Sequence, residues 1–297
     1  MLMFGGYRKD RSLRSYSFAT RQWTQLPDLP TARKAHRSVA VGKEIFLISC
    51  KDNATIERYD VESGRVSTAY HLETYRYSFG ACLYDSDKIM VAGGQPEGLW
   101  SSDTTFLFDT VKGTVEEAAR MTCDRKAFAV VNCGGAVYAI GGSSASVSTI
   151  EHGIKYNSGS LKSIERYDPK SGGWVLAPFE LVVGRRHHCA VAHDRFIYVF
   201  GGETGNVRHF FFDTVERIDT RTDRVEVLRC KMRRPRSRVR AVKVSERRVC
   251  LLGGVIGEMV VSDAVEWFDL DKEEMSSGGE DVVLTGEMCT SFTACVL

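Results

Sequence analysis

Five arginines stand at equivalent positions of this sequence, each 16 or 17 residues before a glycine pair or before the Ser49-Cys50 that replaces one. They are Arg33, Arg76, Arg125, Arg185 and Arg236. Guanidinium groups that surround one cavity raise its positive potential and pair with carboxylates through two parallel hydrogen bonds. The spacing therefore predicts a binding surface for an acidic ligand. The sequence leaves an alternative open, in which each arginine bridges neighbouring repeat units by binding loop carbonyls.

Histidine and cysteine, the residues that would support metal or nucleophilic chemistry, show no spacing of that kind. Of the seven histidines only His187 and His188 are adjacent, and neighbouring residues of a strand point to opposite faces. The nine cysteines include no Cys-x-x-Cys pair and are typical of small buried side chains in a reducing compartment. The sequence contains neither a phosphate-binding glycine loop nor a nucleophile elbow. We therefore expect a protein without catalytic residues, metal or cofactor.

An internal repeat predicts the elements that position the arginines. A β-prone apolar run followed by two glycines occurs five times, and a sixth copy ends in Ser49-Cys50. The marks follow one another at spacings of 44, 44, 48, 60 and 52 residues, close to the period of propeller repeats. Cys50 lacks the freedom of glycine at positive φ, so we expect backbone strain at that position.

Two further marks follow each glycine pair in the same order. The first is a Tyr-Asp pair or its substitute: Tyr16-Ser17, Tyr59-Asp60, Phe108-Asp109, Tyr167-Asp168, Ile218-Asp219 and Phe268-Asp269. The second stands seven residues after the first member of that pair: Trp23, Val66, Val115, Trp174, Val225 and Met275. Turn-forming residues separate four short β-prone runs in each copy, a pattern typical of successive hairpins. Six copies predict an all-β propeller of six four-stranded blades.

The predicted blades divide the chain as a single domain. They span residues 1–26 together with 289–297, then 34–70, 77–118, 126–178, 186–228 and 237–284. The first copy starts at its second strand, whereas residues 289–297 are similar to the first strand of the other copies. We therefore expect the C-terminal strand to pair with the N-terminal strand and close the ring, which leaves only short, protected sheet edges.

The glycine pair, the Tyr-Asp pair and the tryptophan, in this order, resemble the kelch repeat across essentially the whole chain. The stretch IERYDPKSGGW, residues 164–174, resembles the propeller of the BTB–kelch (Kelch-like) proteins. One glycine pair is missing, and four of the six tryptophan positions hold Val or Met. We expect those blades to be less firmly anchored.

The resemblance implies a protein-interaction module that receives an acidic peptide segment of a partner on the face bearing the five arginines. By the same resemblance, the residues that follow the glycine pairs are further candidates: Tyr7, Gln95, Ser143 and Glu203. It also implies a substrate receptor for a cullin-RING ubiquitin ligase, with the BTB domain expected outside these 297 residues. An actin-binding scaffold is the alternative, and a copper oxidase resembling galactose oxidase comes third.

Composition limits the partners further. The net charge is +2, and 43% hydrophobic with 26% charged residues is ordinary for a soluble domain. No run approaches the roughly 20 apolar residues of a membrane-spanning helix, and the apolar start is too short for a signal peptide. We therefore expect no membrane contact and a cytoplasmic or nuclear location.

Two local features could contact a partner. Residues 229–248 hold ten Lys or Arg and one acid, which is typical of a solvated face but also fits an acidic partner. Nucleic acid is the less favoured partner, because no aromatic side chains alternate with these cations to stack on bases. Three consecutive phenylalanines, residues 210–212, predict an outer strand with one exposed ring, or alternatively a partner contact.

Overall fold

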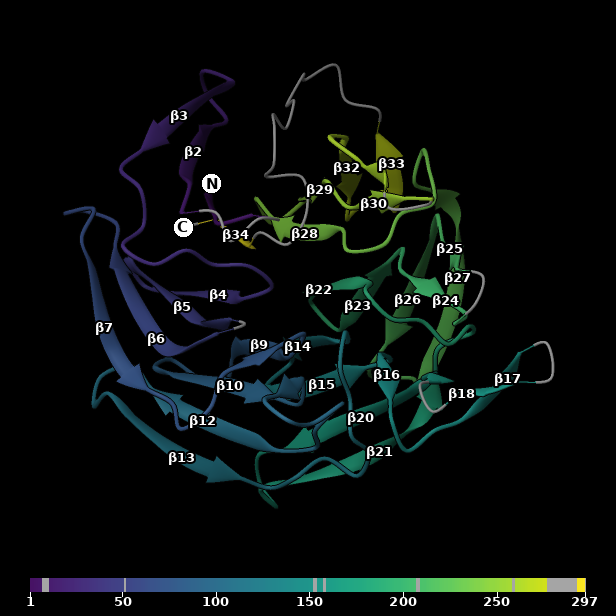
Figure 1. The fold of residues 1–297 in the computed structure, drawn as a ribbon. Coiled ribbons are helices and arrows are strands. Elements are labelled where there is room, and N and C mark those ends of the chain that lie inside the picture. Colours follow the sequence, from purple (N-terminus) through teal and green to yellow (C-terminus); the bar gives the residue numbers. More distant parts are fainter. Residues whose placement is uncertain are drawn as a thin grey trace. The chain divides into compact units, whose positions relative to one another are not determined.

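The computed structural model describes residues 1–6, 11–50, 52–151, 154–156, 159–206, 209–257, 260–276 and 293–296. The elements of these residues are all β-strands (Figure 1). None of the described segments is a helix capable of crossing a membrane. The chain forms two compact units: unit 1 comprises Met1–Tyr77 and Arg238–Leu297, and unit 2 comprises Ser78–Ser237.

Unit 1 contains three four-stranded antiparallel sheets. In hydrogen-bonded order, the first consists of β3 (Gln22–Leu26), β2 (Leu13–Ser17), β1 (Leu2–Phe4) and β34 (Thr293–Cys295). The second is β4 (Arg37–Val41), β5 (Glu44–Cys50), β6 (Asn53–Asp60) and β7 (Val66–His71). The third is β28 (Arg240–Lys243), β29 (Arg248–Leu252), β32 (Val265–Asp269) and β33 (Glu274–Ser276). The two-residue strands β8 (Arg76–Tyr77), β30 (Val255–Ile256) and β31 (Val260–Val261) lie outside these sheets.

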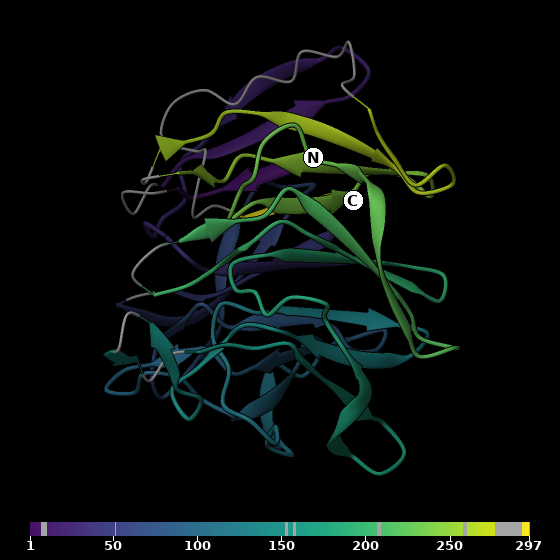
Figure 2. The same cartoon turned by 90° about the vertical axis from the view of Figure 1, so that its right-hand side faces the viewer.

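Unit 2 also contains three such sheets. The first consists of β9 (Gly80–Leu83), β10 (Lys88–Ala92), β12 (Thr105–Asp109) and β13 (Thr114–Ala118). The second consists of β14 (Ala129–Cys133), β15 (Ala136–Ile140), β20 (Ser163–Asp168) and β21 (Gly173–Glu180). The third consists of β22 (Cys189–His193), β23 (Phe196–Phe200), β26 (Thr214–Asp219) and β27 (Arg224–Lys231). Short strands follow the glycine pairs: β11 (Gln95–Pro96), β16 (Ser143–Ser144) with β19 (Gly159–Ser160), β17 (Thr149–Glu151) with β18 (Ile154–Tyr156), and β24 (Glu203–Thr204) with β25 (Phe210–Phe211). Figure 2 shows β27 in green as the outer strand of its sheet.

The described strands thus form six four-stranded sheets, the number of blades that the repeat predicted. The predicted closure is confirmed as well. Strand β34 pairs antiparallel with β1, with Leu2 opposite Cys295 and Phe4 opposite Thr293, so one sheet takes strands from both ends of the chain (Figure 1).

The Tyr-Asp mark and the residue seven positions later form one local unit. In β20 and β21, Tyr167 lies directly opposite Trp174, and their ring centroids are 5.3 Å apart. The Asp168 carboxylate accepts the backbone N–H of Lys170 at 3.1 Å and thereby closes the turn between the two strands. Hydrogen bonds from this turn lower the pKa of Asp168 below its ordinary value. The spacing of seven is therefore the length of one hairpin.

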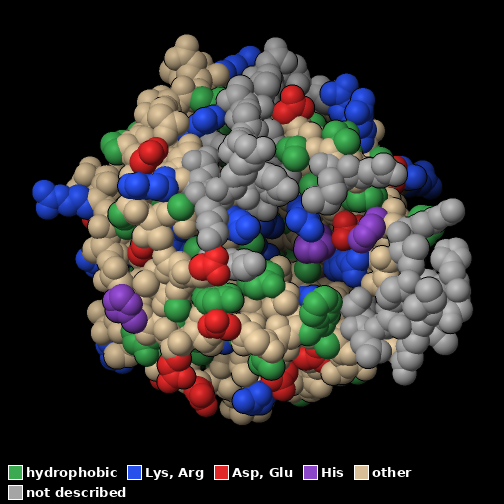
Figure 3. Space-filling view, viewed as in Figure 1, with side chains coloured by type: hydrophobic (Ala, Val, Ile, Leu, Met, Phe, Trp, Pro, Cys, Tyr) green, Lys and Arg blue, Asp and Glu red, His purple; other side chains and the backbone are tan. Residues whose placement is uncertain are grey.

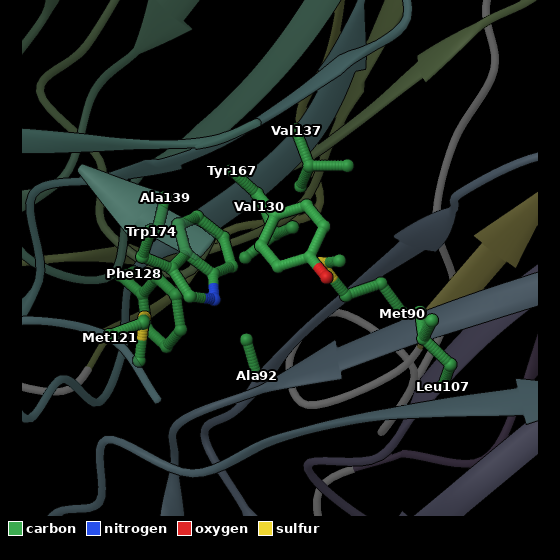
Figure 4. Close-up of a cluster of buried hydrophobic side chains, with 10 residues drawn as sticks. All are labelled: Met90, Ala92, Leu107, Met121, Phe128, Val130, Val137, Ala139, Tyr167 and Trp174. Atoms are coloured by element: carbon green, nitrogen blue, oxygen red, sulfur yellow. The ribbon is translucent and has the colours of Figure 1, made fainter. Parts of the chain in front are cut away.

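The aromatic mark also anchors the core of unit 2. Figure 4 shows a buried cluster to which β10, β12, β14, β15, β20 and β21 all contribute. Within it, Trp174 is 6% exposed and donates its indole N–H to the hydroxyl of Thr105 at 3.2 Å. A buried tryptophan needs such an acceptor, since an indole N–H without one loses its hydrogen bond to water.

The glycine pair brings the chain close to the linker that follows the blade. Gly201 has a φ of 59°, in the left-handed region, and a Cβ on it would lie 2.5 Å from the carbonyl oxygen of Arg236. The N–H of Gly202 donates to that same oxygen at 2.8 Å. The left-handed φ and the close contact with the Arg236 carbonyl oxygen both exclude a side chain at the first glycine.

The degenerate copy, which ends in Ser49-Cys50, has no glycine at this position. Ser49 stands where the other copies have their first glycine, and it adopts a φ of 42°. Its hydroxyl accepts the backbone N–H of Arg76 at 2.9 Å. The strain expected at Cys50 therefore lies at Ser49, one residue earlier, because the left-handed residue is the first of the pair.

The cysteines in the described residues are free thiols. The burial predicted for them holds for Cys50, Cys133, Cys189, Cys250 and Cys295, whereas Cys82, Cys123 and Cys230 are half-buried. Cys82, Cys189, Cys250 and Cys295 lie in β9, β22, β29 and β34. Burial raises the pKa of the Cys295 thiol to about 11, which keeps it protonated and weakly nucleophilic at neutral pH.

His188 is expected to make the fold less stable in acid. Its ring is buried, and Nε2 lies 3.1 Å from the carbonyl oxygen of Ile140. Burial, and then the charge of Arg185, lower the pKa of His188 from 6.5 to about 3. As the pH falls through this window the unfolded chain binds a proton that the folded chain does not, so the free energy of unfolding decreases.

His188→Phe tests this prediction, because Phe128 occupies the equivalent position three residues after Arg125. The variant should lose less stability than the wild type between about pH 6.5 and pH 4. Urea denaturation across that range measures the slope. An unchanged slope would show that this histidine is protonated in the folded state.

Candidate functional site

The five arginines singled out from the sequence lie in the interior of the protein. Arg33, Arg125 and Arg236 are 0% exposed, Arg185 is 1% exposed and Arg76 is 8% exposed. The expectation that their guanidinium groups face a ligand is therefore corrected. The alternative holds in part: three of the arginines bind backbone carbonyls, but these carbonyls belong to the arginine's own blade and not to a neighbouring one.

Arg125 shows why the spacing to the glycine pair is 16 residues. Its Nη1 donates to the carbonyl oxygen of Gly141 at 3.0 Å and to that of Ser163 at 2.9 Å. Its Nη2 lies 2.7 Å from Oε1 of Glu165, and neither side chain of this pair is exposed. The arginine thus ties the end of the second strand, at the first glycine, to the third strand of the same blade.

The same arrangement occurs in two other blades. Arg185 donates to the carbonyl oxygen of Gly201 at 2.9 Å and pairs with Glu216. Arg33 pairs with Glu57 at 2.9 Å, and its Nη1 lies 3.5 Å from the carbonyl oxygen of Ser49. Arg76 differs, since the equivalent residue of β12 is Phe106 rather than Glu, and burial lowers the pKa of Arg76 to about 10.

The paired glutamates also hold the linkers between blades. Glu165 accepts the backbone N–H of Thr122 at 2.6 Å and that of Cys123 at 3.2 Å. Glu216 accepts the N–H of Val182 at 2.9 Å. These glutamates stand two residues before the Tyr-Asp mark, a regularity that would have identified the ion pairs from the sequence.

The residues directly after two of these arginines lie on the surface of unit 2. Lys126 and Arg186 are half-buried, and their backbones form isolated bridges with Ser143 and Glu203. A shift of one residue along an extended chain moves a side chain to the opposite face. The cations available to a ligand in unit 2 are thus displaced by one position from those that the spacing predicted.

Lys126 is held by an aromatic ring and an amide. Its Nζ lies 3.7 Å from the ring centroid of Trp100 and 3.4 Å from Oε1 of Gln95. Burial, followed by the nearby charge of Arg186, lowers the pKa of Lys126 to about 8. An incoming carboxylate would offset both effects, because it places a negative charge beside the ammonium group.

Arg186 is the centre of a polar cluster. Its Nε donates to Oε1 of Glu203 at 3.2 Å, and its Nη2 donates to the carbonyl oxygen of Gly205 at 2.7 Å. Nδ1 of His209 lies 3.4 Å from the same Glu203 oxygen. Figure 3 shows basic, acidic and histidine side chains gathered over β24 and β25.

Large apolar side chains are exposed beside these cations. Trp100 is 57% exposed, its neighbour Leu99 is 56% exposed, and Phe210 in β25 is 62% exposed. Phe210 is thus the exposed ring predicted for residues 210–212. We call the surface formed by Gln95, Trp100, Lys126, Arg186, Glu203, His209 and Phe210 the loop face of unit 2.

The remaining sequence candidates differ in their accessibility. Gln95 is half-buried and contacts Lys126, whereas Ser143 and Glu203 are 1% and 6% exposed. Tyr7 lies outside the described residues. Within the parts of the chain that the structure describes, no three His, Cys, Asp or Glu side chains converge as a metal site would require.

Residues 124–178 and 184–232 match the kelch motif. The first match contains β14 to β20 and most of β21, and the second contains β22 to β27. No curated protein matches this sequence significantly. Two kelch motifs together with six four-stranded blades identify the fold as a kelch-repeat propeller, the class that the repeat marks predicted. This class supports a protein–protein interaction module.

Proposed function

We propose that this protein recognises a partner protein through the loop face of unit 2 and serves as the substrate-recognition propeller of a Kelch-like adaptor for a cullin-RING ubiquitin ligase. The observation that carries the first part is the contact of the exposed Trp100 ring with the half-buried Lys126. Exposed aromatic rings next to a cation are typical of residues that dominate binding energy at interfaces. The second part depends on the resemblance of the repeat to BTB–kelch proteins.

The chemistry of the loop face favours an acidic segment that also carries apolar side chains. Lys126 and Arg186 offer hydrogen bonds to carboxylates, while Trp100 and Phe210 offer apolar surface. Glu203 already neutralises part of the charge of Arg186, so Lys126 is the cation more available to a ligand. The propeller acts in this proposal as a binding module without catalytic chemistry of its own.

Trp100→Ala and Lys126→Ala should each weaken binding of acidic peptides by about tenfold, because each removes half of the cation–aromatic pair. An array of acidic peptides containing apolar residues provides the probe, and fluorescence anisotropy with the best peptide measures the affinity. Lys112→Ala is the matched control, since this lysine is exposed on the turn after β12 and lies outside the loop face.

The pH dependence gives an independent readout of the same site. Affinity should fall as the pH rises through about 8, where Lys126 loses its charge, and should be flat over this range in Lys126→Ala. Binding that is insensitive to both substitutions and to pH would contradict the assignment of the loop face.

The ligase role needs a separate experiment on the protein as it occurs in the cell. Co-purification of a cullin with the endogenous protein would support the receptor. Sedimentation with actin filaments, without a cullin, would instead favour the scaffold that the sequence left as the alternative.

A further inference from the structure

The outer strand of the last blade of unit 2 carries a row of cations outside the loop face. Beyond the start of β27 the exposed positions alternate, with Val227, Arg229 and Lys231 exposed and the residues between them partly covered. The linker that follows adds Arg233 and Arg234, which are exposed as well. We call these five residues the basic edge.

The blade itself does not require these cations. Strand β21 of the preceding blade has the same length and the same irregularity in its pairing, and its equivalent exposed positions are Leu176, Pro178 and Glu180. In the linker after β21, Val182 and Val183 occupy the positions of Arg233 and Arg234. A repeat with the same architecture therefore forms without positive charge at any of these positions.

Few carboxylates offset the charge of the basic edge. Lys231 lies 3.7 Å from Asp213, a contact with a largely exposed lysine. Among the described residues, Arg229 and Arg234 have no carboxylate partner. The surface thus keeps an excess of positive charge that an acidic molecule would offset.

The strand also offers backbone groups. β27 is the last strand in the order β22–β23–β26–β27, and its outer edge carries N–H and C=O groups that no further strand of this sheet pairs with. Cations on such an edge repel other basic or neutral strands. They favour an acidic strand, because opposite charges directly across an antiparallel pair stabilise it.

We propose that the basic edge binds an extended acidic segment of a partner protein, which adds to β27 as a fifth strand. Cations two residues apart along a strand are about 7 Å apart, so the partner should carry acids at alternate positions and an apolar residue near Val227. The basic edge contains no aromatic side chain on which bases would stack, which disfavours single-stranded nucleic acid. None of the five residues of the basic edge belongs to the loop face.

The test is a titration of the whole protein with a fluorescein-labelled peptide of alternating glutamate and threonine that contains one valine. Arg229→Glu combined with Lys231→Glu should weaken binding by at least about tenfold, and the affinity of the wild type should fall as salt is added. Arg224→Glu at the start of β27 is the matched control and should change the affinity less than about twofold. Thermal unfolding of each variant verifies that the fold is intact.

Three outcomes would overturn the proposal. Equal affinity of the folded double variant would exclude the basic edge, and equal binding of a peptide with N-methylated backbone amides would exclude strand addition. Tighter binding of an oligothymidylate of the same charge would identify a nucleic-acid surface instead. Trp100→Ala should leave this peptide's affinity unchanged, so a failure of the basic edge to bind is distinguishable from a failure of the loop-face proposal.

Discussion

Glu165→Ala should lower the free energy of unfolding by about 3–5 kcal/mol. The substitution leaves Arg125 charged in a site where neither side chain of the pair is exposed. It also removes the acceptor of the N–H groups of Thr122 and Cys123. Denaturant unfolding, followed by tryptophan fluorescence, measures the loss.

Two comparisons make this prediction specific. Glu116→Ala removes an acid that is 64% exposed and paired with Lys88, and it should cost no more than about 1 kcal/mol. Arg125→Ala combined with Glu165→Ala should cost much less than the sum of the single substitutions, because the two residues form one interaction. A Glu165→Ala variant as stable as the wild type would mean that the buried charge of Arg125 does not depend on this carboxylate.

Gly201→Ala should be strongly destabilising. A Cβ at this residue would meet the carbonyl oxygen of Arg236 at 2.5 Å and the methyl group of Met232 at 2.7 Å. The backbone also has a φ of 59°, where an alanine costs about 1–2 kcal/mol. Displacement of the Arg236 carbonyl would break its hydrogen bond with Gly202 and add about 1–3 kcal/mol.

Gly134→Ala separates the conformational cost of a side chain at positive φ from the steric cost of displacing the Arg236 carbonyl. Gly134 has a φ of 62°, but a Cβ there has no atom within 4 Å. The Gly134→Ala variant should therefore show only the conformational cost. The difference between its loss of stability and that of Gly201→Ala measures the steric cost. Equal losses would show that the close approach of the glycine pair to the following linker contributes nothing to stability.

The repeat marks were informative because each reports a local geometry. The seven-residue spacing from Tyr167 to Trp174 is the length of one hairpin, so it depends on a turn and on nothing distant. The 16-residue spacing from Arg125 to Gly141 is the distance along two strands to the carbonyl that the arginine binds. Periodic local features of this kind allowed the strand order, the six blades and the pairing of β34 with β1 to be predicted.

The direction of the arginine side chains could not be predicted in this way. Between Arg125 and the first residue of β14 lies Ala127, which has a φ of 54°, and the equivalent residues Ala35, Ser78, His187 and Arg238 have φ values of 53–55°. A left-handed residue interrupts the alternation of side chains, and nothing in an alanine, serine or histidine marks it. The alternation inferred for the strand therefore does not extend back to the arginine.

The sequence by itself determined the class of fold, the number of blades and the closure, because these depend on spacings that recur within each copy. Only the tertiary structure decided which cation faces outward. The left-handed residue leaves Arg125 buried against Glu165 and Lys126 beside Trp100. The identity of an exposed site in a repeat protein thus depends on one backbone angle per repeat, which short-range sequence patterns do not encode.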